Sequence, residues 1–277
     1  MYTLNCNGRL LVIEKPIIMG IINATPDSFF KDSRQTTIQT AVEQAEKMTK
    51  EGAVIIDIGG QSTHPKSSLQ TAATEMERII PVITQIRKTL PEVFISVDTF
   101  YASVAKAAVE AGADIVNDIS GGNLDPKMIE TVANLHVPYI CMHMQGTPQT
   151  MQKYTSYEDI CLDIVDYFIK KTTLAKEAGI IDMIIDPGIG FSKNIQQNFL
   201  LIKQLSIFQI LHKPILLGIS RKSFLYKTLQ KENASEALNA TTAMHMAGLI
   251  NGANILRVHD VAAAQECITL YNAYMAS

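Results

Sequence analysis

One pattern recurs along this chain and restricts its fold more than any other feature. A run of apolar or β-branched residues ends in a carboxylate or an amide, and glycine, proline or a short polar segment follows. At residues 183–190, Asp186 ends an apolar run, and Pro187 and Gly188 then forbid both helix and further strand. The same pattern occupies residues 54–60, 94–99, 115–122, 215–222 and 255–260. Polar groups from several parallel strand ends meet at one mouth, which is how a parallel barrel builds an active site.

The order of apolar runs and helical patterns predicts a (β/α)8 barrel, and 277 residues are near the usual size of one such domain. We expect a single barrel domain over residues 1–277, preceded within residues 1–15 by a hairpin that turns at Asn7 and Gly8 and plugs the amino-terminal mouth. The expected strands are 17–25, 54–59, 94–99, 115–120, 139–144, a strand ending at 186, 215–219 and 255–259. The expected helices are 36–51, 72–90, 102–111, 157–178, 194–211, a short helix after 222, 235–251 and 260–275.

A doubly wound open sheet is the alternative fold. Both folds use strands that are apolar on both faces and alternate with helices. The open sheet favours a glycine-rich phosphate turn after the first strand, and residues 23–27 do not form such a turn. We therefore favour the barrel.

Composition narrows the possible partners and compartments. The 24 basic and 27 acidic residues give a net charge of −3, which argues against nucleic acid or a membrane surface as a partner, so a few placed cations must meet any anionic ligand. The four cysteines are scattered and form no CxxC pair, which argues against a disulfide framework or a zinc site. No apolar run reaches the length of a membrane span, and the first residues lack a signal pattern, so we expect a cytoplasmic protein.

Eight segments together resemble the dihydropteroate synthase family, and they cover nearly the whole chain in order. They are residues 23–29, 57–63, 98–99, 117–118, 142–146, 186–191, 220–223 and 257–260. The resemblance implies that the chain condenses a dihydropterin hydroxymethyl diphosphate with 4-aminobenzoate, forming dihydropteroate and diphosphate. It also implies Mg²⁺ as cofactor and a homodimer.

The chemistry of the pterin suits the residues that the resemblance assigns to it. Its aminopyrimidinone edge carries neighbouring N–H donors, which one carboxylate can accept bidentately. Asp186 is expected in that role, with Asn117 and Asp98 supplying further polar contacts, and the resemblance adds Thr63 to the pterin diphosphate site. Each such residue alone could equally be an ordinary helix or strand cap.

Positive charge for the diphosphate is expected after the last two strands. Lys222 follows one of them, and Arg257 and His259 occupy alternate positions of the other, where barrels usually hold phosphate. The resemblance implies that these three hold the leaving group as the catalytic residues and that Asn23 contacts Mg²⁺. It implies an aminobenzoate side formed by Phe29, Thr63, Pro65, Phe191, Ser220 and Arg221, although Arg221 could equally be structural.

Two departures from the family pattern lie in loops on the aminobenzoate side. His64 stands where many members have arginine, and residues 30–34 lack a frequent Asp-Gly-Gly run. Loops 26–34 and 61–68 are poor in anchoring apolar residues, so we expect them to be mobile and to close over bound pterin diphosphate. That closure would make the substrates bind in order, with the arylamine second.

Two other functions remain open from the residues. A methyltransferase that acts on methyltetrahydrofolate would share the barrel and the pterin contacts, but it has no diphosphate for Lys222, Arg257 and His259 to hold. A non-catalytic pterin-binding paralogue would be compatible with the two loop departures. Release of diphosphate on mixing both substrates would separate the paralogue from the enzyme.

Overall fold

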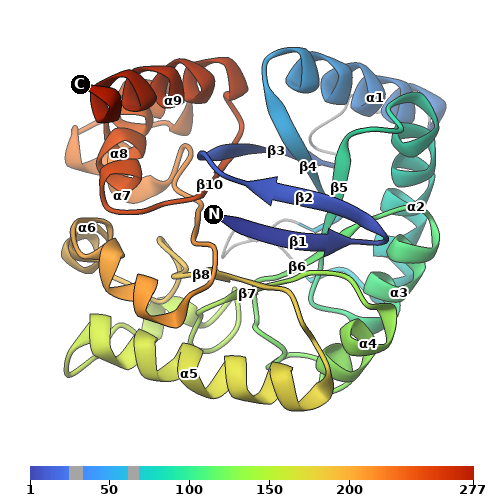
Figure 1. Ribbon diagram of the computed structural model, residues 1–277, viewed down its shortest axis with the longest axis horizontal. Helices are drawn as coiled ribbons and strands as arrows, with labels where there is room; N and C mark the ends of the chain where they lie inside the picture. Colours follow the sequence, from blue (N-terminus) through green and yellow to red (C-terminus); the bar gives the residue numbers. More distant parts are fainter. Residues whose placement is uncertain (25–33, 62–68) are drawn as a thin grey trace.

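Eight parallel strands form a nearly closed barrel, and helices surround it (Figure 1). The structure is a computed structural model that describes residues 1–24, 34–61 and 69–277, with backbone alone for 34–37. The strand order is β8-β7-β6-β5-β4-β3-β10-β9, and a parallel bridge between Ile185 and Ile215 brings the two outer strands together. The strands are β3 (Ile17–Asn23), β4 (Ala53–Gly59), β5 (Phe94–Asp98), β6 (Ile115–Asp118), β7 (Tyr139–Met142), β8 (Met183–Asp186), β9 (Leu216–Leu217) and β10 (Ile255–Val258).

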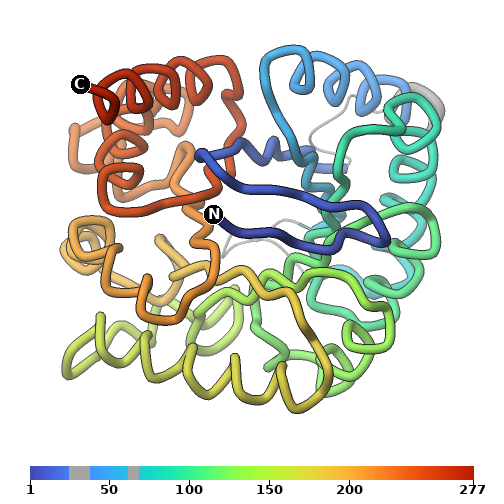
Figure 2. Tube along the Cα trace, viewed as in Figure 1, coloured from blue at the N-terminus to red at the C-terminus, as the bar shows by residue number. Residues whose placement is uncertain are grey.

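The helices lie outside the strands in chain order, as the trace in Figure 2 shows. The α-helices are α1 (Arg34–Lys50), α2 (Ala72–Thr89), α3 (Ala102–Glu110), α4 (Met128–Leu135), α5 (Ile160–Ala178), α6 (Ile195–Lys203), α7 (Ser223–Thr228), α8 (Leu238–Ile250) and α9 (Val261–Ala276). Three 3-10 segments join them, η1 (Met151–Lys153), η2 (Leu205–Leu211) and η3 (Ala234–Ala237). Within the described ranges, no helix is long and apolar enough to cross a membrane.

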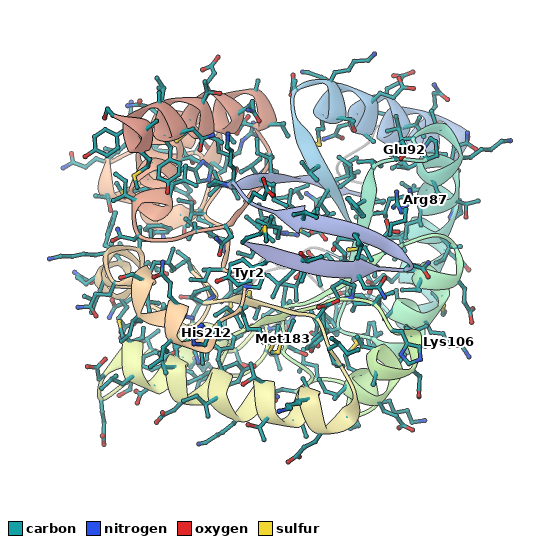
Figure 3. The ribbon with its side chains drawn as sticks, viewed as in Figure 1. Tyr2, Arg87, Glu92, Lys106, Met183 and His212 are labelled. Carbon is teal, nitrogen blue, oxygen red and sulfur yellow. The ribbon has the colours of Figure 1, made fainter. Side chains whose placement is uncertain are left out.

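The predicted hairpin covers the amino-terminal end of the barrel. Strands β1 (Tyr2–Cys6) and β2 (Arg9–Ile13) pair antiparallel, and Asn7 and Gly8 both take positive φ at their turn. In Figure 1 the hairpin crosses in front of the barrel strands. Its buried side chains form one apolar cluster with the first inward-facing residues of the strands: Leu4, Cys6, Leu11, Ile13, Met19, Ile55, Ile115, Ile140, Ile184, Leu216 and Ile255. Tyr2 and Met183, labelled in Figure 3, mark this end.

A layer of polar side chains follows that apolar layer further along the barrel. Successive side chains of a strand alternate between faces, so the residue two positions beyond an inward-facing one also faces inward. Two positions after Ile55, Ile115, Ile184 and Ile255 stand Asp57, Asn117, Asp186 and Arg257. The intervening residues face outward and join a large core with the helices. The polar layer therefore lies toward the carboxyl ends of the strands, as the sequence predicted.

The largest differences from the predicted elements are at three places. Helix α4 was not predicted, because it is only 8 residues long and begins without a side-chain cap. The predicted helix 194–211 divides, since α6 ends at Lys203 and the chain continues as the 3-10 segment η2. Strand β9 is only 2 residues long. The barrel closes beside it all the same, because the backbone N–H of Ile185 donates to the carbonyl of Pro214 at 3.0 Å.

Asp114 fastens the hairpin to the barrel. Its Oδ2 accepts hydrogen bonds from Nη2 of Arg9 in the hairpin at 2.8 Å and from the backbone N–H of Ile95 at 2.7 Å. A third hydrogen bond comes from Nη2 of Arg87 on α2, which is labelled in Figure 3. The Asp114 side chain is only 4% exposed, so this carboxylate joins three separate segments at a buried point.

Replacing Asp114 with alanine should destabilise the fold, because it leaves two arginines without their shared counter-charge. We expect a loss of about 3 kcal/mol in the free energy of unfolding, measured by urea denaturation. Glu110→Gln is the control, since its pair with Lys106 is 3.9 Å long and highly exposed, and should cost less than about 1 kcal/mol. Equal losses in the two variants would contradict the role of Asp114.

Candidate active site

Strand pairing brings the predicted pterin residues together at the carboxyl mouth. Asp98 pairs in register with Asn117 on one side and with Gly59 on the other. Asp186 pairs with Met142 on the far side of β7. Asn117 and Asp186 are buried, with 4% and 6% of their surfaces exposed. The three residues therefore line one part of the barrel wall, as the sequence predicted.

The Arg257 guanidinium reaches across the barrel to two carboxylates. Its Nε donates to Asp57 Oδ2 at 2.6 Å, and its Nη2 donates to Asp98 Oδ2 at 2.6 Å. Asp57 Oδ2 also accepts a hydrogen bond from Asn117 Nδ2 at 3.1 Å. Burial raises the pKa of Asp98, and the positive charge of Arg257 opposes that rise. One network thus joins β4, β5, β6 and β10.

The turn after β8 holds Asp186 in place. The backbone N–H of Gly188 donates to Asp186 Oδ1 at 2.7 Å, and Gly188 takes a φ of +70°. A Cβ at this position would lie 2.0 Å from the carbonyl oxygen of His143, so only glycine fits. Burial raises the pKa of Asp186, and Lys222 is the charge that opposes this most. This turn engages Oδ1 alone and does not involve Oδ2.

Lys222 lies beside Asp186 and is enclosed by the β8 loop. Its Nζ donates to the carbonyl of Ile189 and lies 4.4 Å from the ring centroid of Phe191. Burial lowers the pKa of this ammonium to about 8, although Asp186 opposes the shift. Lys222 therefore carries its charge at neutral pH and loses it under mildly alkaline conditions.

His259 is a partly buried hydrogen-bonding group, and its lowered pKa favours the neutral imidazole. Burial, together with the positive charges of Arg257 and Arg221, lowers its pKa to about 4. Ser220 Oγ accepts the backbone N–H of His259 at 3.2 Å and lies 3.1 Å from its Nδ1. If the Ser220 hydroxyl donates to Nδ1, the proton of the neutral imidazole resides on Nε2, and this is the tautomer that we expect.

Arg221 makes a bidentate ion pair rather than standing free. Its Nε and Nη2 donate to the two oxygens of Asp260 at 2.9 and 2.5 Å. Its backbone is in the left-handed region with a φ of 58°, which few non-glycine residues adopt. The pair ties the loop before α7 to the end of β10 and supports the structural alternative for Arg221.

Some predicted residues cannot be compared with the structure. Phe29, Thr63 and Pro65 lie outside the described residues, as do the departures at His64 and 30–33 and nearly all of the two loops expected to close. Their expected roles stay predictions. Phe191 and Ser220, by contrast, stand in the described mouth, in contact with Lys222 and His259 respectively.

Two ionisable residues of this region, Asp57 and Lys193, have no predicted role from the sequence. Asp57 has no exposed surface, and its sequence signal is a single carboxylate between isoleucines in an otherwise apolar strand. Lys193 is 4% exposed, and its Nζ contacts the Phe191 carbonyl at 2.9 Å and His143 Nδ1 at 3.1 Å. Burial lowers the pKa of Lys193 well below its usual value, with Asp186 opposing. No spacing rule in the sequence marks Lys193.

Comparison with known proteins identifies what this arrangement resembles. The family profile described as pterin binding enzyme matches residues 19–259. The dihydropteroate synthase of Synechocystis is 43% identical over 257 residues, which are 92% of this chain and 89% of that protein. The dihydropteroate synthase of Escherichia coli is 37% identical over 272 residues, covering 98% of this chain and 95% of its own.

Solved structures agree with the sequence comparisons. Dihydropteroate synthase of Xanthomonas albilineans with 4-aminobenzoic acid superposes with a TM-score of 0.92 at 35% identity, covering 99% of this chain and 98% of that one. The same enzyme in complex with 7,8-dihydropteroate gives a TM-score of 0.90 at 34% identity, with both chains fully covered.

The protonation of His259 is open to direct measurement. We expect its imidazole to remain neutral, with the proton on Nε2, from pH 8 down to about pH 5, because its pKa is lowered to about 4. Nitrogen-15 shifts of histidine-labelled protein, assigned by comparison with His259→Gln, report both charge and tautomer. A signal that titrates near pH 6.5, or that carries its proton on Nδ1, would contradict this assignment.

Proposed function

The chain belongs to the pterin-binding enzyme family, among its dihydropteroate synthases, and we propose that the polar barrel mouth carries out their reaction. That reaction condenses 6-hydroxymethyl-7,8-dihydropterin diphosphate with 4-aminobenzoate and releases 7,8-dihydropteroate and diphosphate. The chain is therefore a transferase of folate biosynthesis, the enzyme class that sulfonamides target.

A single observation carries the assignment of this site. The mouth has an acceptor side, formed by Asp98, Asn117 and Asp186, and a cationic side, formed by Lys222 and Arg257. A pterin diphosphate has the complementary division, because its ring edge donates hydrogen bonds and its tail is anionic. Asp186 accepts from the ring edge, and Asp98 and Asn117 complete the contacts.

The cationic side serves the leaving group. As the bond to the diphosphate breaks, negative charge develops on the departing oxygen, and groups already fixed in place stabilise it without reorganisation. Arg257 is held by two carboxylates and Lys222 by the Ile189 carbonyl, so both are fixed before substrate arrives. His259 contributes a neutral Nε2–H donor. The arylamine then attacks the methylene carbon, and no nucleophilic side chain is required.

The aminobenzoate side is assigned to Phe191, Ser220 and Arg221 among the described residues. Phe191 lies against the Lys222 ammonium, next to the departing diphosphate. Ser220 is 6% exposed and its hydroxyl contacts His259. Arg221 enters this side mainly through its pair with Asp260, which fixes the backbone between Ser220 and Lys222.

Mg²⁺ is the proposed cofactor, with Asn23 as its protein contact. Asn23 ends β3 and pairs in register with Gly59, whose other neighbour is Asp98, so the residue lies at the same mouth. The described residues contain no group of three or more His, Cys, Asp or Glu side chains that could hold a metal. One hard oxygen donor suits an ion bound mainly through diphosphate and water. Such an ion would neutralise charge on the diphosphate.

Helices α8 and α9 are the proposed contact between two copies of the chain. They expose several large apolar side chains, which are Leu238, Ile250, Leu270, Tyr274 and Met275. Exposed apolar side chains of this kind suit a two-fold interface. Sedimentation velocity should show a dimer, and Leu270→Glu should convert it to a monomer; wild-type protein that sediments as a monomer at micromolar concentration would contradict the proposal.

Release of diphosphate tests the function itself. Wild-type protein mixed with both substrates should release one diphosphate for each dihydropteroate formed, and Asp186→Ala should weaken pterin binding by about 3 kcal/mol, or roughly 100-fold. Binding is measured by calorimetry with 6-hydroxymethylpterin, and circular dichroism verifies that the variant folds. Pterin binding without diphosphate release would favour the non-catalytic paralogue.

Lys222 should give the reaction an alkaline limit. Its pKa of about 8 means that the charge stabilising the leaving group is present below that pH and lost above it. We expect turnover to fall above pH 8, and Lys222→Ala to lower turnover by about 2–4 kcal/mol, or roughly 30- to 1,000-fold. Lys222→Arg keeps a cation at every pH, so its slower turnover should lack the alkaline decline. A decline that persists in Lys222→Arg would assign it to another group.

A further inference from the structure

Asp57 occupies an unusual position for an acidic side chain. It lies within β4 rather than at its end, has no exposed surface, and pairs in register with Ile21 and Ser96. The pterin and diphosphate contacts proposed above do not include it. A buried carboxylate costs several kcal/mol unless it is paired, so its partners reveal what it does.

The partners of Asp57 come from both sides of the barrel. The strands run in the order β6-β5-β4-β3-β10, so Asn117 on β6 and Arg257 on β10 each stand two strands away from Asp57, in opposite directions. Both reach the same oxygen. Asp57 Oδ2 accepts from Asn117 Nδ2 at 3.1 Å and from Arg257 Nε at 2.6 Å, while Oδ1 has no partner among the described residues.

Contact with Asp57 decides which way the Asn117 amide faces. An amide has a donor end and an acceptor end of nearly the same shape, so packing alone does not choose between the two orientations. A carboxylate accepts from the donor end and repels the acceptor end. With Nδ2 directed at Asp57, Asn117 presents Oδ1 and its second N–H to a ligand.

Asp57 also orients the guanidinium of Arg257. The Nε and Nη2 of Arg257 are bound by Asp57 and Asp98, which fixes the plane of the group. Nη1 makes no hydrogen bond to the described residues and is left for an anion. If Asp98 were the sole anchor, the guanidinium could rotate about that one contact.

We propose that Asp57 is a positioning residue that sets two recognition groups at once, the Asn117 amide for the pterin edge and the Arg257 guanidinium for the diphosphate. The proposal rests on the roles given to Asn117 and Arg257 in the proposed function. A simpler role would be charge balance, in which Asp57 neutralises Arg257 alone. The two roles differ in what they predict for a pterin that carries no phosphate.

Two probes and two variants separate these roles. Calorimetry with 6-hydroxymethylpterin reports the ring-edge contacts, and calorimetry with inorganic diphosphate and Mg²⁺ reports the anion contacts. Asp57→Ala should weaken both probes at least tenfold. Asp57→Asn keeps an oxygen that can accept from Asn117 and Arg257, so it should bind 6-hydroxymethylpterin within threefold of wild type although its charge is gone.

Asp114→Ala is the matched control. It also removes a buried carboxylate that holds two arginines, but at the amino-terminal end of the barrel. Measured where it is folded, it should bind both probes as wild type does. A general loosening of the barrel would instead weaken binding in this control as well, and that result would overturn the proposal.

Other outcomes also overturn the positioning role. Charge balance would be the whole role if Asp57→Ala lost only its binding of diphosphate. The same conclusion would follow if Asp57→Asn bound 6-hydroxymethylpterin as weakly as Asp57→Ala does. If the alanine variant does not fold, the NMR signal of the Asn117 side-chain amide in unliganded wild type tests the contact with Asp57. One of the two amide protons should then resonate downfield and exchange slowly with solvent. Wild-type protein that binds neither probe would instead contradict the proposed function, and the Asn117 signal still tests the contact with Asp57.

Discussion

The guanidinium of Arg257 is a permanent positive charge inside the barrel, and the arrangement of the mouth follows from satisfying it. An unpaired charge there would cost several kcal/mol, so carboxylates must approach it from neighbouring strands. Asp57 on β4 and Asp98 on β5 do so, and each has an oxygen 2.6 Å from a guanidinium nitrogen of Arg257. Those carboxylates in turn need donors, and Asn117 supplies one. A polar layer can persist above an apolar one because each of its charges compensates another.

The same burial divides the titratable groups of the mouth into two kinds. It raises the pKa of Asp98 and Asp186 and lowers that of Lys222, Lys193 and His259. Each of these five groups is thus moved toward its neutral form, and nearby opposite charges oppose the shift. Charge at this mouth is therefore a property of the whole set, so removing one member alters the protonation of its neighbours.

The sequence predicted the barrel, the hairpin and the polar strand ends because each depends on local rules of periodicity and turn chemistry. Asp186 is an example, because the turn that holds it is formed by the residues that directly follow it, Pro187 and Gly188. Asp57 was missed because its importance depends on strands two positions away on either side, and a strand pattern carries no information about that register. The lowered pKa of His259 could not be predicted, because its sequence neighbours do not reveal its burial. Helix α4 was missed because it is short and lacks a cap.

The hairpin that covers the amino-terminal end determines how ligands and water reach the polar layer of the barrel. Leu4, Cys6, Leu11 and Ile13 complete an apolar layer there, so the polar residues above it can be reached from the carboxyl end alone. A barrel that is closed at one end has a single opening. Any ligand of the polar layer, and any water that it displaces, must therefore pass through the same mouth. Entry, exit and dehydration of the site share one route, which is set by the hairpin at the opposite end of the barrel.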